Sequence, residues 1–187
     1  ASFGPSAKGI EQANIDAYLF TPRGGKYYTV LNSPVFIKAW HAVFQDGRYR
    51  SYDWTFKLDA DAVFVPDRVR ALLSHHCVEG PEDCRAKYLA NFGGDLHGPV
   101  EALSRKAMER YAEQEKRCTT EVDYSDKGED WYLDLCMELL EIPGEEEPSL
   151  LSDWHVDQGF PSPCDTMHAT FHPFKVWDYY YRCLCES

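Results

Sequence analysis

Apolar and polar residues alternate along one short stretch of the chain, residues 53–58. Its apolar members are Trp54, Phe56 and Leu58, and a polar residue stands before each of them. Because successive side chains of a strand point to opposite faces, this alternation predicts a β-strand with one apolar face. The predicted strand runs directly into Asp59-Ala60-Asp61, so two carboxylates leave it in a turn.

A different spacing, with apolar residues three and four positions apart, predicts helices elsewhere. The clearest helix begins at Pro34, after Asn32 and Ser33, and ends near Gly47. Further helices are expected over residues 66–73, 105–117, 129–142 and 176–184. The helix that opens with Glu129 should bury one stripe of side chains: Trp131, Leu135, Leu139 and Leu140.

Short apolar runs between the helices predict the remaining strands. They cover residues 27–31, 88–92, 150–156 and 166–172. Strands that alternate with helices favour a layered α/β domain with at least partly parallel strands. The length of 187 residues suits a single domain, 1–187, in which residues 1–26 show no pattern that predicts a confident strand or helix.

The excess of acidic over basic residues makes some classes of binding partner unfavourable. With 19 basic and 31 acidic residues the formal net charge is −12, which repels nucleic acid and anionic membrane surfaces. An anionic substrate would need a cation or a local basic cluster to approach. No apolar run is long enough to span a membrane, so we expect no membrane contact by this segment. The chain begins at Ala1 without a methionine, and we expect a processed chain or a fragment.

Seven cysteines are many for a chain of this length, and none forms a CxxC pair. Disulfides in a secretory compartment are therefore favoured over a structural zinc site. Cys77 and Cys84 bracket a polar, turn-rich loop that a bridge could close. Cys183 and Cys185 are too close to pair with each other, so they should pair elsewhere, and one cysteine stays free or pairs between chains.

Asp59 and Asp61 are the first candidates for chemistry. Two carboxylates at a strand end can converge on one hard cation such as Mg²⁺, Mn²⁺ or Ca²⁺. A cation held there can bind a diphosphate. The alternative is that the two acids only end the strand in a solvated turn.

Other polar clusters have simpler explanations in the sequence. His75 and His76 follow the helix over 66–73, where imidazoles interact favourably with the helix dipole. Glu129 and Asp130 lie in a first helical turn, which the same dipole favours. The acidic run over 145–147 is expected to be solvated and to have no further role.

The order of these elements resembles the glycosyltransferases of the GT-A fold, in particular the fringe and β-1,3-galactosyltransferase group with its algal or protist relatives. In that group an Asp-rich metal motif follows a strand; a glycine-containing segment ending in Ser, a Glu-Asp pair and a late His come next. The matching stretches here are Asp59-Ala60-Asp61, 93–104, Glu129-Asp130 and His172-Pro173-Phe174-Lys175. The resemblance covers about residues 27–182, and Ala60 replaces the middle acid of the metal motif.

The resemblance implies a three-layer GT-A-like fold with a mostly parallel central sheet. It also implies an N-terminal strand that reads the nucleotide base. Because residues 1–26 are weakly patterned, we expect that strand to be truncated or divergent here.

The activity implied is metal-dependent transfer of a hexose from a nucleotide-diphosphate sugar to a hydroxyl of a glycan or glycoprotein, with inversion, in the Golgi lumen. Asp59, Asp61 and His172 would bind Mn²⁺ or Mg²⁺, and Lys175 would contact phosphate. His172 could equally be a strand-end histidine without a ligand role.

Asp130 would be the general base, with Glu129 as the second choice. Residues that would shape the donor or acceptor cleft are Gly93, Gly94, His97 and Gly98. Trp131 and Trp154 could stack on sugar faces, although core packing is the simpler role for Trp131.

Two other functions are compatible with the sequence. One is a non-catalytic carbohydrate-binding or scaffold domain with a degenerate GT-A fold, which the weakly patterned N-terminus favours. The other is a metal-dependent hydrolase of phosphate esters, which would need more clustered His and Asp ligands than the sequence shows.

Overall fold

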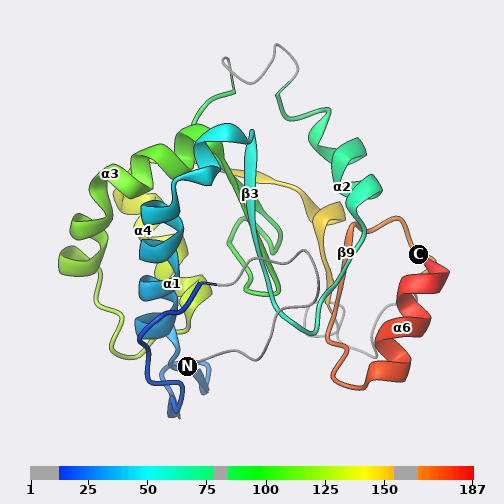
Figure 1. Cartoon of the computed structure of the whole chain (residues 1–187), viewed down its shortest axis with the longest axis horizontal. Helices are drawn as coiled ribbons and strands as arrows, with labels where there is room; N and C mark the ends of the chain where they lie inside the picture. Colours follow the sequence, from blue (N-terminus) through cyan, green and yellow to red (C-terminus); the bar gives the residue numbers. More distant parts are fainter. Residues whose placement is uncertain (1–12, 78–83, 154–163) are drawn as a thin grey trace.

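A computed structural model of the chain describes residues 13–77, 84–153 and 164–187 (Figure 1). Its helices are α1 (Ser33–Asp46), α2 (Pro66–Leu73), α3 (Arg105–Glu121), α4 (Glu129–Leu139) and α6 (Trp177–Glu186). Its strands are β1 (Arg23–Gly24), β2 (Thr29–Val30), β3 (Trp54–Leu58), β4 (Val63–Phe64), β5 (Tyr88–Ala90), β6 (Val100–Ser104), β7 (Gly144–Glu146), β8 (Ser152–Asp153) and β9 (Thr170–His172). Two short 3₁₀ helices cover Arg48–Ser51 and Pro148–Leu150.

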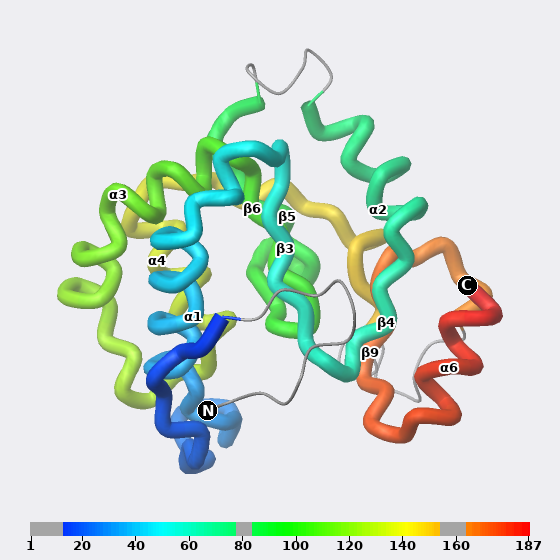
Figure 2. Tube along the Cα trace, viewed as in Figure 1, coloured from blue at the N-terminus to red at the C-terminus, as the bar shows by residue number. Residues whose placement is uncertain are grey.

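The mixed α/β class agrees with the prediction, but the directions of the strands do not. The larger sheet has the order β3–β6–β5–β7, in which β6 runs antiparallel to both neighbours and β5 and β7 are parallel. The smaller sheet, β4–β9–β8, also mixes an antiparallel and a parallel pair. Figure 2 shows β4 and β9 side by side. The expectation of a mostly parallel central sheet is therefore wrong. The order of strands and helices along a chain does not by itself determine whether neighbouring strands in the sheet are parallel or antiparallel.

Prolines, glycines and capping residues in the sequence predicted the ends of several helices correctly. The helix α2 has the predicted bounds, and α1 ends where Gly47 adopts the left-handed conformation with φ 76°. Ser104 caps α3, since its hydroxyl accepts a hydrogen bond from the amide of Ala107. The segment before Tyr27 contains one short strand that was not expected, β1, which pairs with β2 in a separate two-stranded sheet.

The core lies on both faces of the larger sheet because alternate residues of its strands point to opposite sides. On β6, Val100 and Ala102 pack toward Val69 of α2. Leu103 faces the other side, where it joins the cluster formed by residues of α1, α3 and α4. Helices therefore cover both faces of this sheet, with α1, α3 and α4 on one side and α2 on the other (Figure 1).

The buried side of α4 differs from the predicted stripe. Tyr132, Leu133, Cys136 and Met137 are buried, whereas Trp131, Leu135 and Leu139 are only partly covered. This helix carries apolar residues around most of its circumference, so spacing alone does not say which side packs inward. Cys136 lies on the buried side and is bonded to Cys118 of α3, so the disulfide connects the two helices.

Three disulfides connect neighbouring elements: Cys77–Cys84, Cys118–Cys136 and Cys164–Cys183. The first closes the loop that the sequence marked for a bridge. The third confirms that Cys183 pairs away from Cys185, which is free and exposed. Three disulfides are compatible with an oxidising secretory or extracellular environment.

The acidic run was predicted to be solvated and to have no further role. Glu145 and Glu146 are exposed as predicted, but the run does have a structural role: these two residues lie in β7 at the edge of the larger sheet, beside β5, and Glu147 follows directly. The two ring nitrogens of His76 lie at hydrogen-bond distance from Glu145 and Glu147, at 2.9 and 3.0 Å. Lys87 also donates to Glu145. Tertiary contacts of this kind leave no trace in local spacing.

None of the helices in the described ranges is both long and apolar enough to cross a membrane. One predicted sugar-stacking residue, Trp154, lies outside the described residues.

Candidate functional site

The turn after β3 holds Asp59 and Asp61 in fixed positions. The amide of Ala62 donates to the carbonyl of Asp59 at 3.0 Å, which closes the turn. The amide of Asp59 donates to the carbonyl of Pro99, and the amide of Phe174 donates to the carbonyl of Asp61. Two other segments of the chain therefore fix the backbone on which both carboxylates stand.

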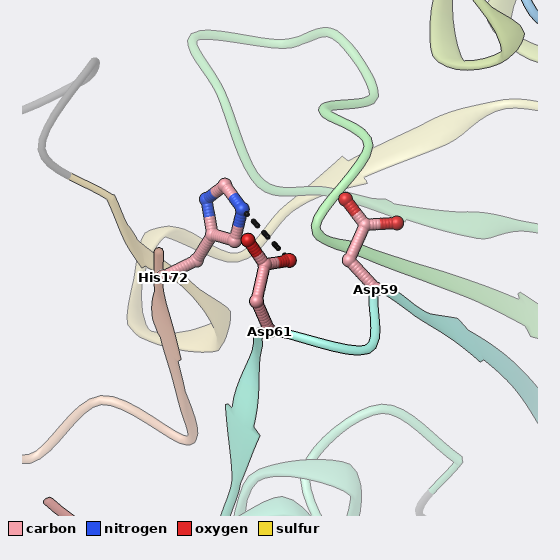
Figure 3. Close-up of side chains that lie close together, drawn as sticks. All are labelled: Asp59, Asp61 and His172. Atoms are coloured by element: carbon pink, nitrogen blue, oxygen red, sulfur yellow. Dashed lines mark ion pairs between the residues drawn. The ribbon is translucent and has the colours of Figure 1, made fainter. Parts of the chain in front are cut away.

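His172 reaches the same turn from β9. Its strand pairs antiparallel with β4, which follows the turn directly, so the end of β9 lies beside Asp61. The Nε2 atom of His172 lies 3.5 Å from Oδ1 of Asp61 (Figure 3). One ligand atom from each of Asp59, Asp61 and His172 lies within 4.8 Å of the others. The structure thus brings together the three metal ligands proposed from the sequence.

The donor set suits a divalent cation such as Mn²⁺ or Mg²⁺. Two carboxylate oxygens and one imidazole nitrogen are ligands that Mn²⁺ accepts, while Mg²⁺ favours the oxygens. Opposite ligands of an octahedral Mg²⁺ are about 4 Å apart. The largest separation here, up to 4.8 Å, is slightly greater, so small rotations of the side chains would seat such an ion.

Asp153, at the end of β8, lies directly behind His172. Its side chain is completely buried, and its Oδ2 is 2.5 Å from Nδ1 of His172. The same Oδ2 lies 3.5 Å from Nε2 of His97. One buried carboxylate therefore contacts two imidazoles from different parts of the chain.

His97 continues this series of contacts to the start of α4. Its Nδ1 lies 3.6 Å from Oδ2 of Asp130, on the side away from Asp153. Burial by itself lowers the pKa of His97, but the two carboxylates outweigh burial and raise the pKa to about 9. His97 is therefore a cation at neutral pH.

Asp130 is held ionised by the groups around it. Burial favours its neutral form, yet His97 and the amides of Trp131 and Gly98 together lower its pKa. The amide of Trp131 donates to Oδ1 at 2.8 Å, and the amide of Gly98 donates to Oδ2 at 3.2 Å. The carboxylate stays 30% exposed and is thus open to a bound molecule.

The 97–98 loop approaches α4 closely at Gly98. A Cβ atom there would lie 2.9 Å from Oε1 of Glu129 and 3.5 Å from Oδ2 of Asp130. Asn91 holds the loop from the other side: it donates to the carbonyls of His97 and Val100 and accepts from the amide of His97. These bonds place the imidazole of His97 between Asp130 and Asp153.

Glu129 is less available than Asp130. Its carboxylate is 12% exposed and accepts a hydrogen bond from Nζ of Lys57 at 3.0 Å. The same ammonium donates to Asp59 at 2.7 Å and to the carbonyl of Gly98 at 2.6 Å. Burial lowers the pKa of Lys57, but the acids around it outweigh burial and raise it, so Lys57 stays charged. A cation bound to Asp59 would share this carboxylate with Lys57.

Glu101 is a second buried acid close to the site. It lies opposite Lys57 in the β3–β6 register, and its side chain is fully buried. Neither of its oxygens has a hydrogen-bond partner in the part of the chain that the structure describes. Burial raises its pKa to about 8, against the attraction of Lys57.

The other predicted residues have mixed outcomes. Lys175 lies 3.9 Å from Asp61 and is largely exposed. It therefore lies at the edge of the cation group, by which we mean the three candidate ligands Asp59, Asp61 and His172. Gly93 and Gly94 form a turn with positive φ values of 55° and 99°. Within the described residues, no reported contact joins them to the acids of the site. Trp131 is partly exposed and packs edge-on against Tyr27.

Four residues of the site were missed from the sequence: Asp153, Lys57, Asn91 and Glu101. Asp153 and Glu101 stand in or next to apolar strand runs, where a lone acid is unusual and was a usable signal. Lys57 had a weaker signal, since the alternation 53–58 makes it look like a solvent-facing strand residue. Asn91 had no signal, because its role depends on a loop that folds back to it.

No protein-family model matches the chain, and no curated protein shows significant similarity to it. The resemblance to the GT-A glycosyltransferases therefore rests on the motifs of this sequence alone, and the geometry of the site is an independent source of argument.

Proposed function

We propose that this protein transfers a sugar from a nucleotide-diphosphate donor to a hydroxyl of a glycan or glycoprotein, with Mn²⁺ or Mg²⁺ as cofactor. The observation that carries the proposal is the convergence of Asp59, Asp61 and His172 in one group, connected through Asp153 and His97 to Asp130. A cation site and an ionised carboxylate in one place are what such a reaction requires.

The acids would hold the cation, and the cation would neutralise negative charge developing on the leaving diphosphate. Lys175, beside Asp61 and largely exposed, is placed to add a positive charge for a phosphate oxygen. The positive charges of the cation and of Lys175 would offset the repulsion that a protein of net charge −12 exerts on an anionic donor.

Asp130 would take the proton from the acceptor hydroxyl. It is more exposed than Glu129, and no lysine pairs with it among the reported contacts of the described residues. Its lowered pKa means that it is ionised and ready to accept a proton at neutral pH, at the cost of some basicity. Attack from the face opposite the leaving group would invert the anomeric carbon. The three disulfides are compatible with an oxidising compartment, and we propose the Golgi lumen as the site of action.

The test is calorimetric titration of UDP and GDP into the protein with and without Mn²⁺. We expect binding that requires Mn²⁺ and that the double variant Asp59→Asn/Asp61→Asn weakens by about tenfold or more, because two of the ligand charges are gone. The matched control is Asp67→Asn, since Asp67 is an almost fully exposed carboxylate on α2. Binding that is indifferent to Mn²⁺, or to the double variant, contradicts the proposal.

A non-catalytic scaffold is the second candidate, and one observation favours it. Among the described strands β3 pairs with β6 alone, so its other edge has no neighbour there. Cavities of about 530 and 500 Å³, both lined by Trp54 and Phe56, lie beside this strand. In a complete GT-A fold we would expect the strand that binds the nucleotide base beside this edge, and a fold without it would favour a scaffold role. Binding of a glycan in the absence of any nucleotide binding would support this function instead.

Hydrolysis of phosphate esters is less well supported. Such enzymes commonly use two metals about 4 Å apart. Only one group of three ligands occurs among residues 13–77, 84–153 and 164–187.

A further inference from the structure

Asp153 occupies an unusual position for an acid. Its side chain has no exposed surface, and it stands at the end of β8, directly beside His172 in the parallel β8–β9 register. A carboxylate without access to water is costly unless charged or hydrogen-bonding groups compensate it. The imidazoles of His172 and His97 are both within 3.5 Å of it and supply part of that compensation.

The contact with His172 determines which nitrogen of that ring faces the cation group. Oδ2 of Asp153 lies at hydrogen-bond distance from Nδ1 of His172. A carboxylate in its ionised form can only accept hydrogen bonds, so with Asp153 ionised the shared proton belongs to Nδ1 of His172. Nε2, which points to Asp61, is then the nitrogen with a free lone pair in the neutral ring. That tautomer and orientation are the ones a metal ligand needs.

The contact with His97 reaches the other end of the site. It is a contact between charged groups and not a hydrogen bond, since Nε2 of His97 has no hydrogen-bond partner in the part of the chain that the structure describes. The Nε2 atom of His97 faces Asp153, and its Nδ1 faces Asp130. The series Asp61–His172–Asp153–His97–Asp130 therefore alternates carboxylates and imidazoles from five different segments. Asp153 is its central member, and it is the only one of these five with no exposed side-chain surface.

We propose that Asp153 is a positioning residue that orients two histidines at once: His172 toward the cation and His97 toward Asp130. This inference rests on the proposed function, since it assigns Asp153 a role within that same site. Through it the geometry of the cation ligands and that of the proposed base depend on a single buried carboxylate.

The first test compares Mn²⁺ affinity in the full chain and in Asp153→Asn, which keeps the size of the side chain but removes its charge. We expect affinity to fall by about 10- to 100-fold, the usual loss when the partner of a metal-bound histidine is changed. The control is Glu115→Gln, because Glu115 makes a similar contact with His41 at 2.9 Å between α1 and α3. Unchanged Mn²⁺ affinity in a folded Asp153→Asn protein would overturn the inference and leave the proposed function standing.

The second test needs no metal and is read on the wild-type protein. Nitrogen-15 NMR of the metal-free protein reports which ring nitrogen carries the proton, and His172→Gln assigns the signals of residue 172. We expect the neutral ring of His172 to be protonated at Nδ1, and a majority of the Nε2–H tautomer would overturn the inference. If the protein bound no Mn²⁺ at all, the proposed function would fail, while this measurement would still decide whether Asp153 orients His172.

Discussion

At the scale of single residues, Asp130 combines accessibility with a fixed orientation. Two backbone amides, from Trp131 and Gly98, bind one oxygen each, and His97 lies beside the carboxylate. These groups keep the carboxylate charged in spite of its partial burial. They also fix its orientation, because the two amides bind different oxygens of the carboxylate.

Replacing Asp130 with Asn should lower the turnover of sugar transfer by about 10²- to 10⁴-fold, because the amide cannot accept the proton of the acceptor hydroxyl. Mn²⁺-dependent nucleotide binding should persist, since the cation ligands are unchanged. Steady-state kinetics together with calorimetry would separate the two effects. Asp134→Asn is the control, because Asp134 lies one turn further along α4 and bonds to Tyr88. Undiminished turnover in Asp130→Asn would remove this residue as the base.

At the scale of elements, His76 connects three segments that are distant in sequence. It follows α2, bonds to Glu145 and Glu147 at the edge strand β7 and just beyond it, and packs edge-on against Trp54 of β3. Its side chain is 6% exposed. Since the parallel β5–β7 pair is short, these bonds add an anchor for the edge of the sheet.

Substitution of His76 by Ala should lower the free energy of unfolding by about 1–3 kcal/mol, because it removes one contact from each of two glutamates and a packed ring. Urea denaturation followed by circular dichroism measures this. The neighbouring His75 is exposed, so His75→Ala is a close control that should change stability by less than about 0.5 kcal/mol. Equal effects of the two variants would show that the bonds to β7 contribute little.

At the scale of the whole molecule, buried titrating groups make stability depend on pH. The pKa of Glu101 rises from 4.5 to about 8 on folding. A raised pKa means that the folded state retains a proton that the unfolded state releases. The stability contributed by this group is therefore complete below about pH 4.5 and is lost as the pH rises through 8.

The wild-type protein should accordingly lose a few kcal/mol of unfolding free energy between pH 5 and pH 9, of the order set by a shift of this size. Glu101→Gln should remove most of this dependence because glutamine does not titrate. Any remaining decrease in unfolding free energy between about pH 6.5 and pH 9 would come from His97, whose pKa is also raised on folding. Urea titrations across this range provide the measurement, with Glu113→Gln on the exposed side of α3 as control. Parallel pH profiles of wild type and Glu101→Gln would contradict this assignment.

The sequence by itself determined the elements whose causes are local. Alternation predicted β3, proline at the first turn predicted the start of α2, and Gly47 predicted the end of α1, because each depends on backbone preferences of adjacent residues. The two acids of the turn could be proposed as ligands because their chemistry is visible in their identity, whereas His172 was proposed only through the resemblance to the GT-A glycosyltransferases. Cys77 and Cys84 could be paired because the chain between them is short.

Only the tertiary structure decided which of these groups meet and in what environment. Strand direction, the buried side of α4 and the role of Glu145 and Glu147 depend on contacts between segments far apart in the chain, which no local pattern encodes. Asp153 shows the same limit most clearly. In the sequence it is one acid after an apolar run. Its importance arises when β8 and β9 lie side by side and its buried carboxyl group meets two histidines.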